Sequence, residues 1–95
     1  MKMIYKSHGY DLDLSKITRL YPAVRIDVHG EYAQVSLEWA ELNADKVKLD
    51  AYILVFDFDP LGELVKSRIE LSFSTKEELF DEMQRVDIFV KEKKR

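Results

Sequence analysis

Residues 49–58 read Leu-Asp-Ala-Tyr-Ile-Leu-Val-Phe-Asp-Phe, and this stretch sets the architecture that the rest of the chain completes. Successive side chains of a β-strand point to opposite faces, and here both faces are apolar. One face carries Ala51, Ile53 and Val55. The other carries what we call the aromatic row: Tyr52, Leu54, Phe56 and Phe58. A strand without a polar face is typical of the middle of a sheet covered on both sides, so we predict a central strand.

A turn signal and a second strand follow directly. Residues 59–62, Asp-Pro-Leu-Gly, suit a type I turn followed by a glycine bulge, which gives a three-residue loop. From residue 63 to residue 73, apolar and polar side chains alternate, as expected for a strand with one face in the core. A register slipped by one residue is the alternative. The predicted register pairs Val55 with Ser67, Ile53 with Ile69, Leu54 with Arg68, and Phe56 with Lys66.

A shorter hairpin precedes the long one. Residues 23–28 alternate between apolar and polar, His29-Gly30 forms a two-residue turn, and the alternation resumes from Glu31 to Trp39. This turn length places Val24 opposite Val35 and Ile26 opposite Ala33, so that apolar residues meet on one face. The polar segment 41–48 is predicted to be a loop, with a helical turn as the alternative.

The two ends of the chain complete the pattern. Residues 2–6 are predicted to form a first strand that breaks at Ser7-His8-Gly9. A short helix is predicted to follow, capped by Asp13 or Ser15 and ending near Tyr21 because Pro22 disfavours helical geometry there.

The C-terminal segment carries the signature of a long helix. Both Ser74-x-x-Glu77 and Thr75-x-x-Glu78 fit a capping box, and an apolar stripe follows at helical spacing. Residues 86–91 also alternate, so a strand is the rival interpretation. No Gly, Pro or Asn interrupts the segment, and we therefore favour one continuous helix.

These elements predict an α+β fold of one domain, residues 1–95. The expected order is β-α-β-β-β-β-α, with a four- to five-stranded antiparallel meander, a C-terminal helix packed on one face and a short N-terminal helix. Apolar residues make up 46% of the chain and charged residues 35%, a globular balance.

Composition narrows the function classes. The formal charge is −3, which argues against a general nucleic-acid binder. There is no cysteine, so disulfides and thiolate metal sites are excluded. No apolar run approaches the ~20 residues that span a bilayer, and no apolar leader is present, so we expect no membrane contact and a cytoplasmic location. We predict no cofactor.

The carboxylates near the long turn are the sharpest chemical candidates. Asp57 and Asp59 share a strand face, and Glu63 follows the turn. Such a group could hold a divalent cation or share a proton in a metal-dependent hydrolase. The alternative is that Asp59 caps the turn and Asp57 merely ends the strand. Residues 11–15 begin like a calcium loop but lack its later glycine and glutamate, so we reject that site.

Both histidines stand beside glycines in predicted turns. His8 could join Ser7 and Asp11 or Asp13 in a nucleophilic arrangement, but neighbours so close in sequence rarely reach triad geometry. His29 is expected to adopt the left-handed conformation that its turn requires. The three glycines are isolated, so no phosphate-binding loop is predicted.

A possible interaction surface remains. If the C-terminal helix covers the face of Ile53 and Val55, the aromatic row (Tyr52, Leu54, Phe56, Phe58) lies uncovered beside Lys66 and Arg68. The alternative is that the N-terminal segment folds across the row. The last five residues, Lys91 to Arg95, include four basic residues that could touch an anionic partner, although short charge runs are commonly solvated.

Three functions are therefore considered. The first is a small non-enzymatic domain that binds a protein partner or forms a homodimer through a sheet face. The second is a nucleic-acid or anionic-partner module that uses Lys66, Arg68 and the basic tail. The third is the metal-dependent hydrolase with Asp57, Asp59 and Glu63.

Overall fold

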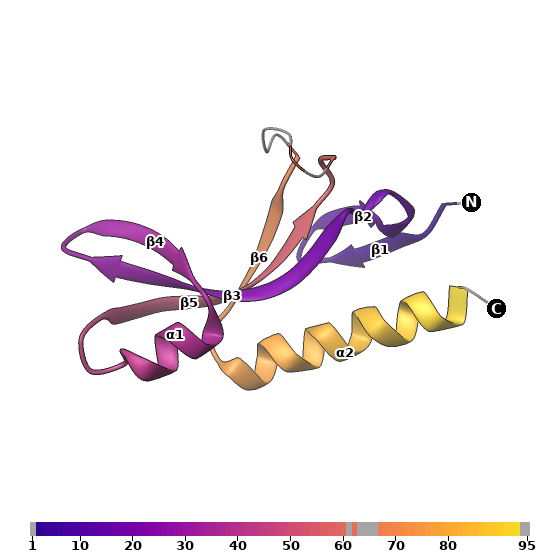
Figure 1. Ribbon diagram of the computed structural model, residues 1–95. Coiled ribbons are helices and arrows are strands. Elements are labelled where there is room, and N and C mark those ends of the chain that lie inside the picture. Colours follow the sequence, from indigo (N-terminus) through magenta and orange to yellow (C-terminus); the bar gives the residue numbers. More distant parts are fainter. Residues whose placement is uncertain (1, 61, 63–66, 94–95) are drawn as a thin grey trace.

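The structure is a computed structural model that describes residues 2–60, 62 and 67–93. It confirms the α+β class, with a four-stranded antiparallel sheet, a separate two-stranded sheet and a long C-terminal helix (Figure 1). In chain order the elements are β1 (Ile4–Ser7), β2 (Tyr10–Asp13), the 3-10 turn η1 (Leu14–Lys16), β3 (Arg19–Val28), β4 (Glu31–Val35), α1 (Leu37–Leu42), β5 (Lys48–Asp57), β6 (Ile69–Phe73) and α2 (Lys76–Lys93).

The strand order of the larger sheet is β4-β3-β5-β6. β5 lies between β3 and β6, which confirms that residues 49–58 supply a central strand. The order is not the predicted meander, because β5 pairs with β3 and not with β4. α1 explains the difference: it packs Ala40 against Val24 and Ile26 of β3, and so carries the chain from β4 across β3 to β5.

The β3–β4 hairpin has the predicted register. Val24 lies opposite Val35, and Ile26 lies opposite Ala33. Strand β4 is shorter than predicted and ends at Val35, so the expected strand positions up to Trp39 are wrong. The Ser36 hydroxyl accepts a hydrogen bond from the Trp39 N–H (3.1 Å) and thereby caps a helix that begins where alternation predicted a strand.

The predicted N-terminal helix is wrong over most of its length. The strand at the N-terminus pairs with a second strand, β2, through a turn at His8-Gly9, where both residues have positive φ. Asp13 is a cap, but only of the single turn η1. Its carboxylate accepts hydrogen bonds from the Ser15 hydroxyl (2.6 Å) and from the Met3 N–H (3.2 Å), and these bonds lower the Asp13 pKa.

Pro22 lies inside β3 and does not end an element. It pairs with Leu54 of β5 on one side. On the other side β4 reaches only as far as Val24. Because no described strand pairs with Pro22 on that side, its missing N–H costs no ladder hydrogen bond.

The β5–β6 hairpin is present, but its predicted register is wrong by three residues. Val55 lies opposite Glu70 and Leu54 opposite Leu71. The strands end at Asp57 and begin again at Ile69, so residues 58–68 separate them in the sequence, too many for the three-residue loop that Asp-Pro-Leu-Gly suggested. Of the predicted turn and second arm, Leu61 and residues 63–66 lie outside the described part of the chain.

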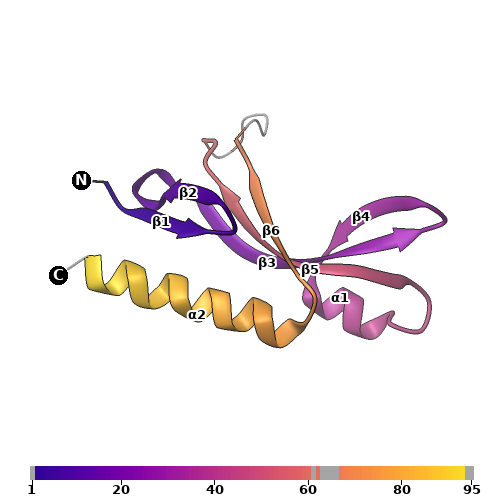
Figure 2. The ribbon, with the colours of Figure 1, turned by 180° about the vertical axis from the view of Figure 1, so that it is seen from behind.

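The main core lies on the face of β5 that carries the aromatic row. α2 and the β1–β2 hairpin both lie on this side (Figures 1 and 2). Leu54 and Phe56 pack there with Leu79 and Val86 of α2. The N-terminal part of the chain adds Tyr5, Leu12 and Leu14.

The opposite face of the sheet holds a smaller buried cluster. Ala23, Ile53 and Val55 are at most 2% exposed, so β5 is buried on both faces as predicted. Tyr21 packs against this cluster, and the Arg19 guanidinium lies 4.7 Å from the Tyr21 ring centroid.

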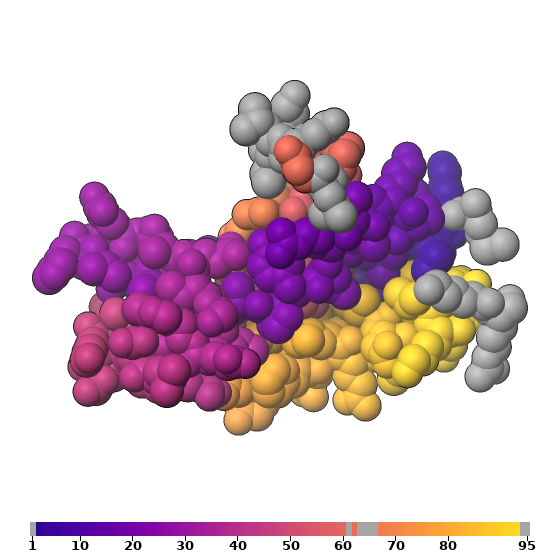
Figure 3. Space-filling model, viewed as in Figure 1, coloured from indigo at the N-terminus to yellow at the C-terminus, as the bar shows by residue number. Residues whose placement is uncertain are grey.

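The molecule is elongated, with extents of 45 × 30 × 23 Å. β4, α1 and the α1–β5 connection form one end, whereas β1, β2 and the C-terminal part of α2 form the other (Figure 1). The space-filling view shows β4 and α1 together at their end of the molecule (Figure 3).

α2 is one continuous helix from Lys76 to Lys93, which confirms the helix interpretation of residues 86–91. The Thr75 hydroxyl accepts a hydrogen bond from the Glu78 N–H (3.1 Å), so the second of the two predicted capping boxes supplies the cap.

We predict that Thr75→Ala lowers the free energy of unfolding by about 1 kcal/mol, measured by chemical denaturation. Ser74→Ala is the matched control and should change stability by less than ~0.5 kcal/mol; equal losses in the two variants would contradict this assignment.

Candidate functional site

The aromatic row is not an exposed surface of the chain. Leu54 and Phe56 are 0% exposed beneath α2, so the premise that this face is uncovered is wrong. The C-terminal helix covers the row itself, because β6 is shifted by three residues and places Leu71 and Phe73 on the same face as the row. Tyr52 and Phe58 are half-buried and pack at the margin of the same core.

The cations predicted beside the row do not form an open patch. The Arg68 side chain is 28% exposed, and its Nη2 lies 3.4 Å from Oδ2 of the buried Asp57. Lys66 lies outside the described residues. Arg68 is therefore engaged with a carboxylate of its own chain.

The predicted carboxylates Asp57 and Asp59 accept hydrogen bonds from main-chain N–H groups of their own hairpin. Asp57 Oδ1 accepts a hydrogen bond from the Asp59 N–H (3.4 Å), and Asp59 Oδ2 accepts one from the Ser67 N–H (2.9 Å). Both carboxylates are buried, and Glu63 lies outside the described residues. Within residues 2–60, 62 and 67–93, no three His, Asp or Glu side chains are arranged to hold a metal ion.

The two histidines occupy equivalent turns. His8 and His29 have φ values of 51° and 54°, and each precedes a glycine with positive φ. The pattern matches the two-residue type I′ turn, which requires positive φ at both central positions. The His8 ring packs edge-on against Phe73 with centroids 5.0 Å apart, while Asp13, its suggested partner, binds Ser15.

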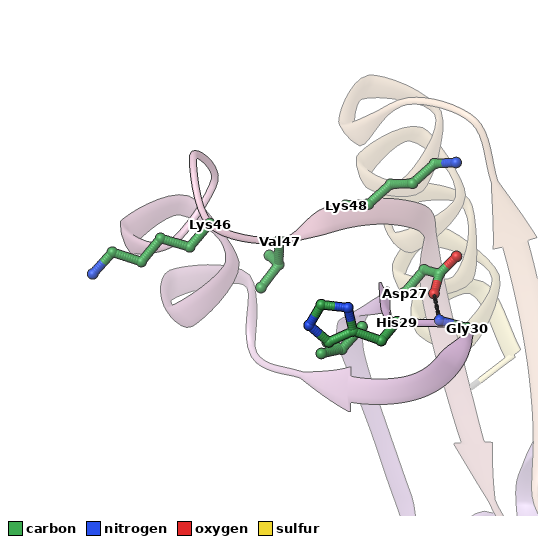
Figure 4. Close-up of a pocket in the computed structure, with 7 residues that line it drawn as sticks. Asp27, His29, Gly30, Lys46, Val47 and Lys48 are labelled. Carbon is green, nitrogen blue, oxygen red and sulfur yellow. Dashed lines mark hydrogen bonds between the residues drawn. The ribbon is translucent and has the colours of Figure 1, made fainter.

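A cavity of about 310 Å³ lies between the β3–β4 turn and the segment that enters β5. His29 and Val47 face each other across it (Figure 4). Lys46 and Lys48 point in opposite directions, so their ammonium groups do not converge on one anion (Figure 4). Asp27 accepts a hydrogen bond from the Gly30 N–H (2.8 Å) and thereby supports the turn.

A second concavity, of about 450 Å³, lies between β3 and α2. Leu20, Met83, Val86 and Val90 line it, with Asp87 at the margin. Because Val86 belongs to the main core, this groove is the open border of the core beneath α2.

A buried polar pair joins the N-terminal hairpin to α2. The Tyr5 hydroxyl donates a short hydrogen bond to Glu82 Oε2, and Arg85 Nη1 donates to Glu82 Oε1 (3.0 Å). Glu82 is only 2% exposed although it lies among the apolar residues of the helix stripe. Burial first, and then the hydrogen bond to the Glu82 carboxylate, raise the pKa of Tyr5. Sequence reasoning missed this pair, because a glutamate on an apolar helix face was its only signal.

Exposed apolar side chains gather at the end formed by β4 and α1. Ten large hydrophobic residues of the described chain are exposed, and half of them fall between residues 28 and 49. Leu42 is 81% exposed and Tyr32 is 65% exposed, the two highest values among them. We call this group the β4–α1 patch: Val28, Tyr32, Trp39, Leu42 and Leu49. It borders the β4 edge on both faces of the sheet, because Tyr32 lies on the face away from α1.

Strand β4 also presents an open edge. Among the strands of the described residues, it is the terminal one of its sheet and pairs only with β3. Glu31 to Gln34 are exposed and Val35 is half-buried. The patch therefore combines apolar side chains with main-chain groups that no strand of the described chain pairs.

Comparisons with protein-family models, with curated proteins and with solved structures found no match. Among the described residues, neither helix has the length and apolar character that crossing a membrane requires.

Proposed function

We propose that this chain is a protein-interaction module whose contact surface is the β4–α1 patch. The observation that carries the proposal is the concentration of exposed apolar residues beside an open strand edge. Isolated exposed apolar residues are ordinary, but five of them at one end of the molecule, on both sides of an open strand edge, favour a partner site. An open edge adds main-chain donors and acceptors, which a partner strand can pair by extending the sheet.

The proposed class of function, protein interaction, is the one predicted from the sequence, but the proposed contact surface is the β4–α1 patch and not the aromatic row. The sheet face predicted to bind a partner is core, whereas the edge of the same sheet is open. Neither alternative has a comparable observation in its favour. Arg68 is paired with Asp57, and the carboxylates of Asp57 and Asp59 accept hydrogen bonds from their own hairpin.

The proposal predicts where ligands bind. Peptides selected from a random library against the purified protein should bind the patch, because such selections favour surfaces already suited to a partner. We expect the double variant Tyr32→Glu, Leu42→Glu to weaken their binding at least tenfold in fluorescence anisotropy, since each change places a charge in an apolar contact.

A matched control is the double variant Phe80→Glu, Ile88→Glu, which adds the same charges to exposed apolar positions of α2. It should change peptide affinity by less than twofold. Selected peptides that respond to the α2 variant and not to the patch variant would contradict the proposal, as would a selection that yields no binders. Circular dichroism would verify that both variants are folded.

A further inference from the structure

The β3–β4 turn determines which main-chain groups of β4 face outward. In a type I′ turn at His29-Gly30, Val28 and Glu31 form a hydrogen-bonded pair. Hydrogen-bonded and non-hydrogen-bonded pairs alternate along an antiparallel ladder. The N–H and C=O groups of Glu31, Ala33 and Val35 therefore point toward β3. Those of Tyr32 and Gln34 point away from the sheet.

This edge lacks the usual protection against pairing. Exposed edges are commonly blocked by charged side chains, above all lysine, by proline or by a β-bulge. β4 reads Glu-Tyr-Ala-Gln-Val and contains neither lysine nor proline; its one charged residue, Glu31, is the first residue of the strand, beside the turn. The irregularity of this sheet lies in the pairing of β3 with β5, between Arg25 and Ile26, and the β3–β4 ladder is regular.

We propose that the occupant of this edge is a second copy of the chain, paired antiparallel through β4 about a two-fold axis at Ala33. The inference rests on the proposed function, because it names the partner of the same patch. Tyr32 then lies opposite the partner's Gln34, and Gln34 opposite the partner's Tyr32. These are the residues whose main-chain groups point outward, so the pairing forms four N–H to C=O hydrogen bonds.

The side chains suit this register. Ala33 meets the partner's Ala33 as a non-hydrogen-bonded pair, the closer of the two pair types, with Cα atoms ~4.5 Å apart. A small residue fits at this position. Glu31 meets the partner's Val35, so no like charges stand directly opposite each other. Registers centred on Tyr32 or on Gln34 instead pair one of the two outward residues with the His29-Gly30 turn or with the Ser36 cap.

Symmetric pairing also suits the flanking apolar residues. Tyr32 lies on the face away from α1, beside Gln34, whose amide donates to the Tyr21 hydroxyl (3.3 Å). The partner's Tyr32 would pack over this Gln34 and extend the apolar contact across the axis. A two-fold arrangement closes on itself, so the assembly stops at a dimer.

The first test measures mass in solution. Sedimentation of the full chain should show a species of twice the 11.2 kDa chain mass, increasingly populated as concentration rises. Gln34→Pro removes the outward N–H of residue 34 without removing a main-chain hydrogen bond to β3, so it should weaken dimerisation at least tenfold while the chain stays folded. Gln34→Ala is the matched control, since it also loses the contact to Tyr21 but keeps the N–H, and it should remain dimeric.

The second test fixes the register. The chain has no cysteine, so Ala33→Cys and Glu31→Cys each introduce one thiol. Under oxidation, Ala33→Cys should form a cross-linked dimer at least tenfold faster than Glu31→Cys. In the proposed pairing two Glu31 positions are about 14 Å apart, from four residues at ~3.4 Å each, which is beyond the reach of a disulfide.

Each outcome bears on the pairing. A wild-type chain that stays monomeric at high micromolar concentration would overturn it, as would a dimer that Gln34→Pro leaves intact. Faster cross-linking of Glu31→Cys than of Ala33→Cys would also overturn it. None of these results alters the peptide-binding comparison, so failure of the dimer is distinguishable from failure of the interaction module.

Discussion

Replacing Phe56 by alanine is expected to lower the free energy of unfolding by about 3–5 kcal/mol. Phe56 is 0% exposed, lies on the central strand and belongs to the cluster that α2 and the N-terminal hairpin close. The loss combines the transfer free energy of a buried ring with a cavity that the rigid strand pairs on both sides cannot collapse. Because small domains have total stabilities of roughly 5–15 kcal/mol, urea denaturation should show a strongly reduced midpoint.

Phe58 provides a matched comparison on the same row. It is the same residue type, but it is half-buried and packs only at the margin of the core. Phe58→Ala should therefore cost less than half as much as Phe56→Ala. Equal losses, or a loss below ~1 kcal/mol for Phe56→Ala, would mean that the row is not covered by α2 and would restore the sheet face as a candidate surface.

The position of β5 was predictable because its pattern has one physical interpretation. Apolar residues on both faces leave no side that water can solvate, so the strand belongs in the middle of the sheet. The register of its partner was not predictable in the same way. Asp59-Pro60 and Gly62 are strong turn formers, but a turn signal does not state how far the strands extend on either side of it. Residues 58–68 separate the strands, and this length decided the register.

The N-terminal hairpin could have been found from the sequence. His8-Gly9 is the same dipeptide as His29-Gly30, and the two pairs adopt similar positive φ values. A turn was predicted at both sites, but only the second was assigned to a hairpin, because long alternating segments flank it. The first is flanked by short strands, and Asp13 beside Ser15 resembled a helix cap. A cap signal predicts the start of a helical turn and not its length, so it does not distinguish a single turn from a helix.

The location of the candidate site was not predictable for a different reason. Alternation shows that β5 has two apolar faces, but it does not show which face α2 covers. That choice depends on contacts of α2 with Leu54, Leu71 and the N-terminal Leu12, which are distant in sequence. When the helix covers the aromatic row, the exposed apolar residues shift to the short segments that connect strands. Leu42 and Trp39 had been assigned to a loop and a strand, so their exposure had no sequence signal.

Removal of the Tyr5 hydroxyl is expected to show how strongly the N-terminal hairpin is held on α2. Tyr5→Phe leaves one oxygen of the buried Glu82 without its donor and should cost about 1–3 kcal/mol of unfolding free energy. Glu82→Leu should cost a similar amount, because it leaves the Tyr5 hydroxyl buried without an acceptor. The double variant replaces both polar groups by apolar ones and should be closer to wild type than the sum of the single losses.

The same pair predicts a pH dependence. The pKa of Tyr5 is raised in the folded protein, so the unfolded chain ionises this tyrosine first, near pH 10. The stabilisation from Tyr5 is then complete below pH 10 and is lost as the pH rises toward the folded pKa. In denaturation measured between pH 8 and pH 11, the advantage of wild type over Tyr5→Phe should therefore shrink at the alkaline end. Additive single losses, or an advantage that grows with pH, would show that the hydroxyl does not bind Glu82 and that apolar packing alone holds the hairpin on α2.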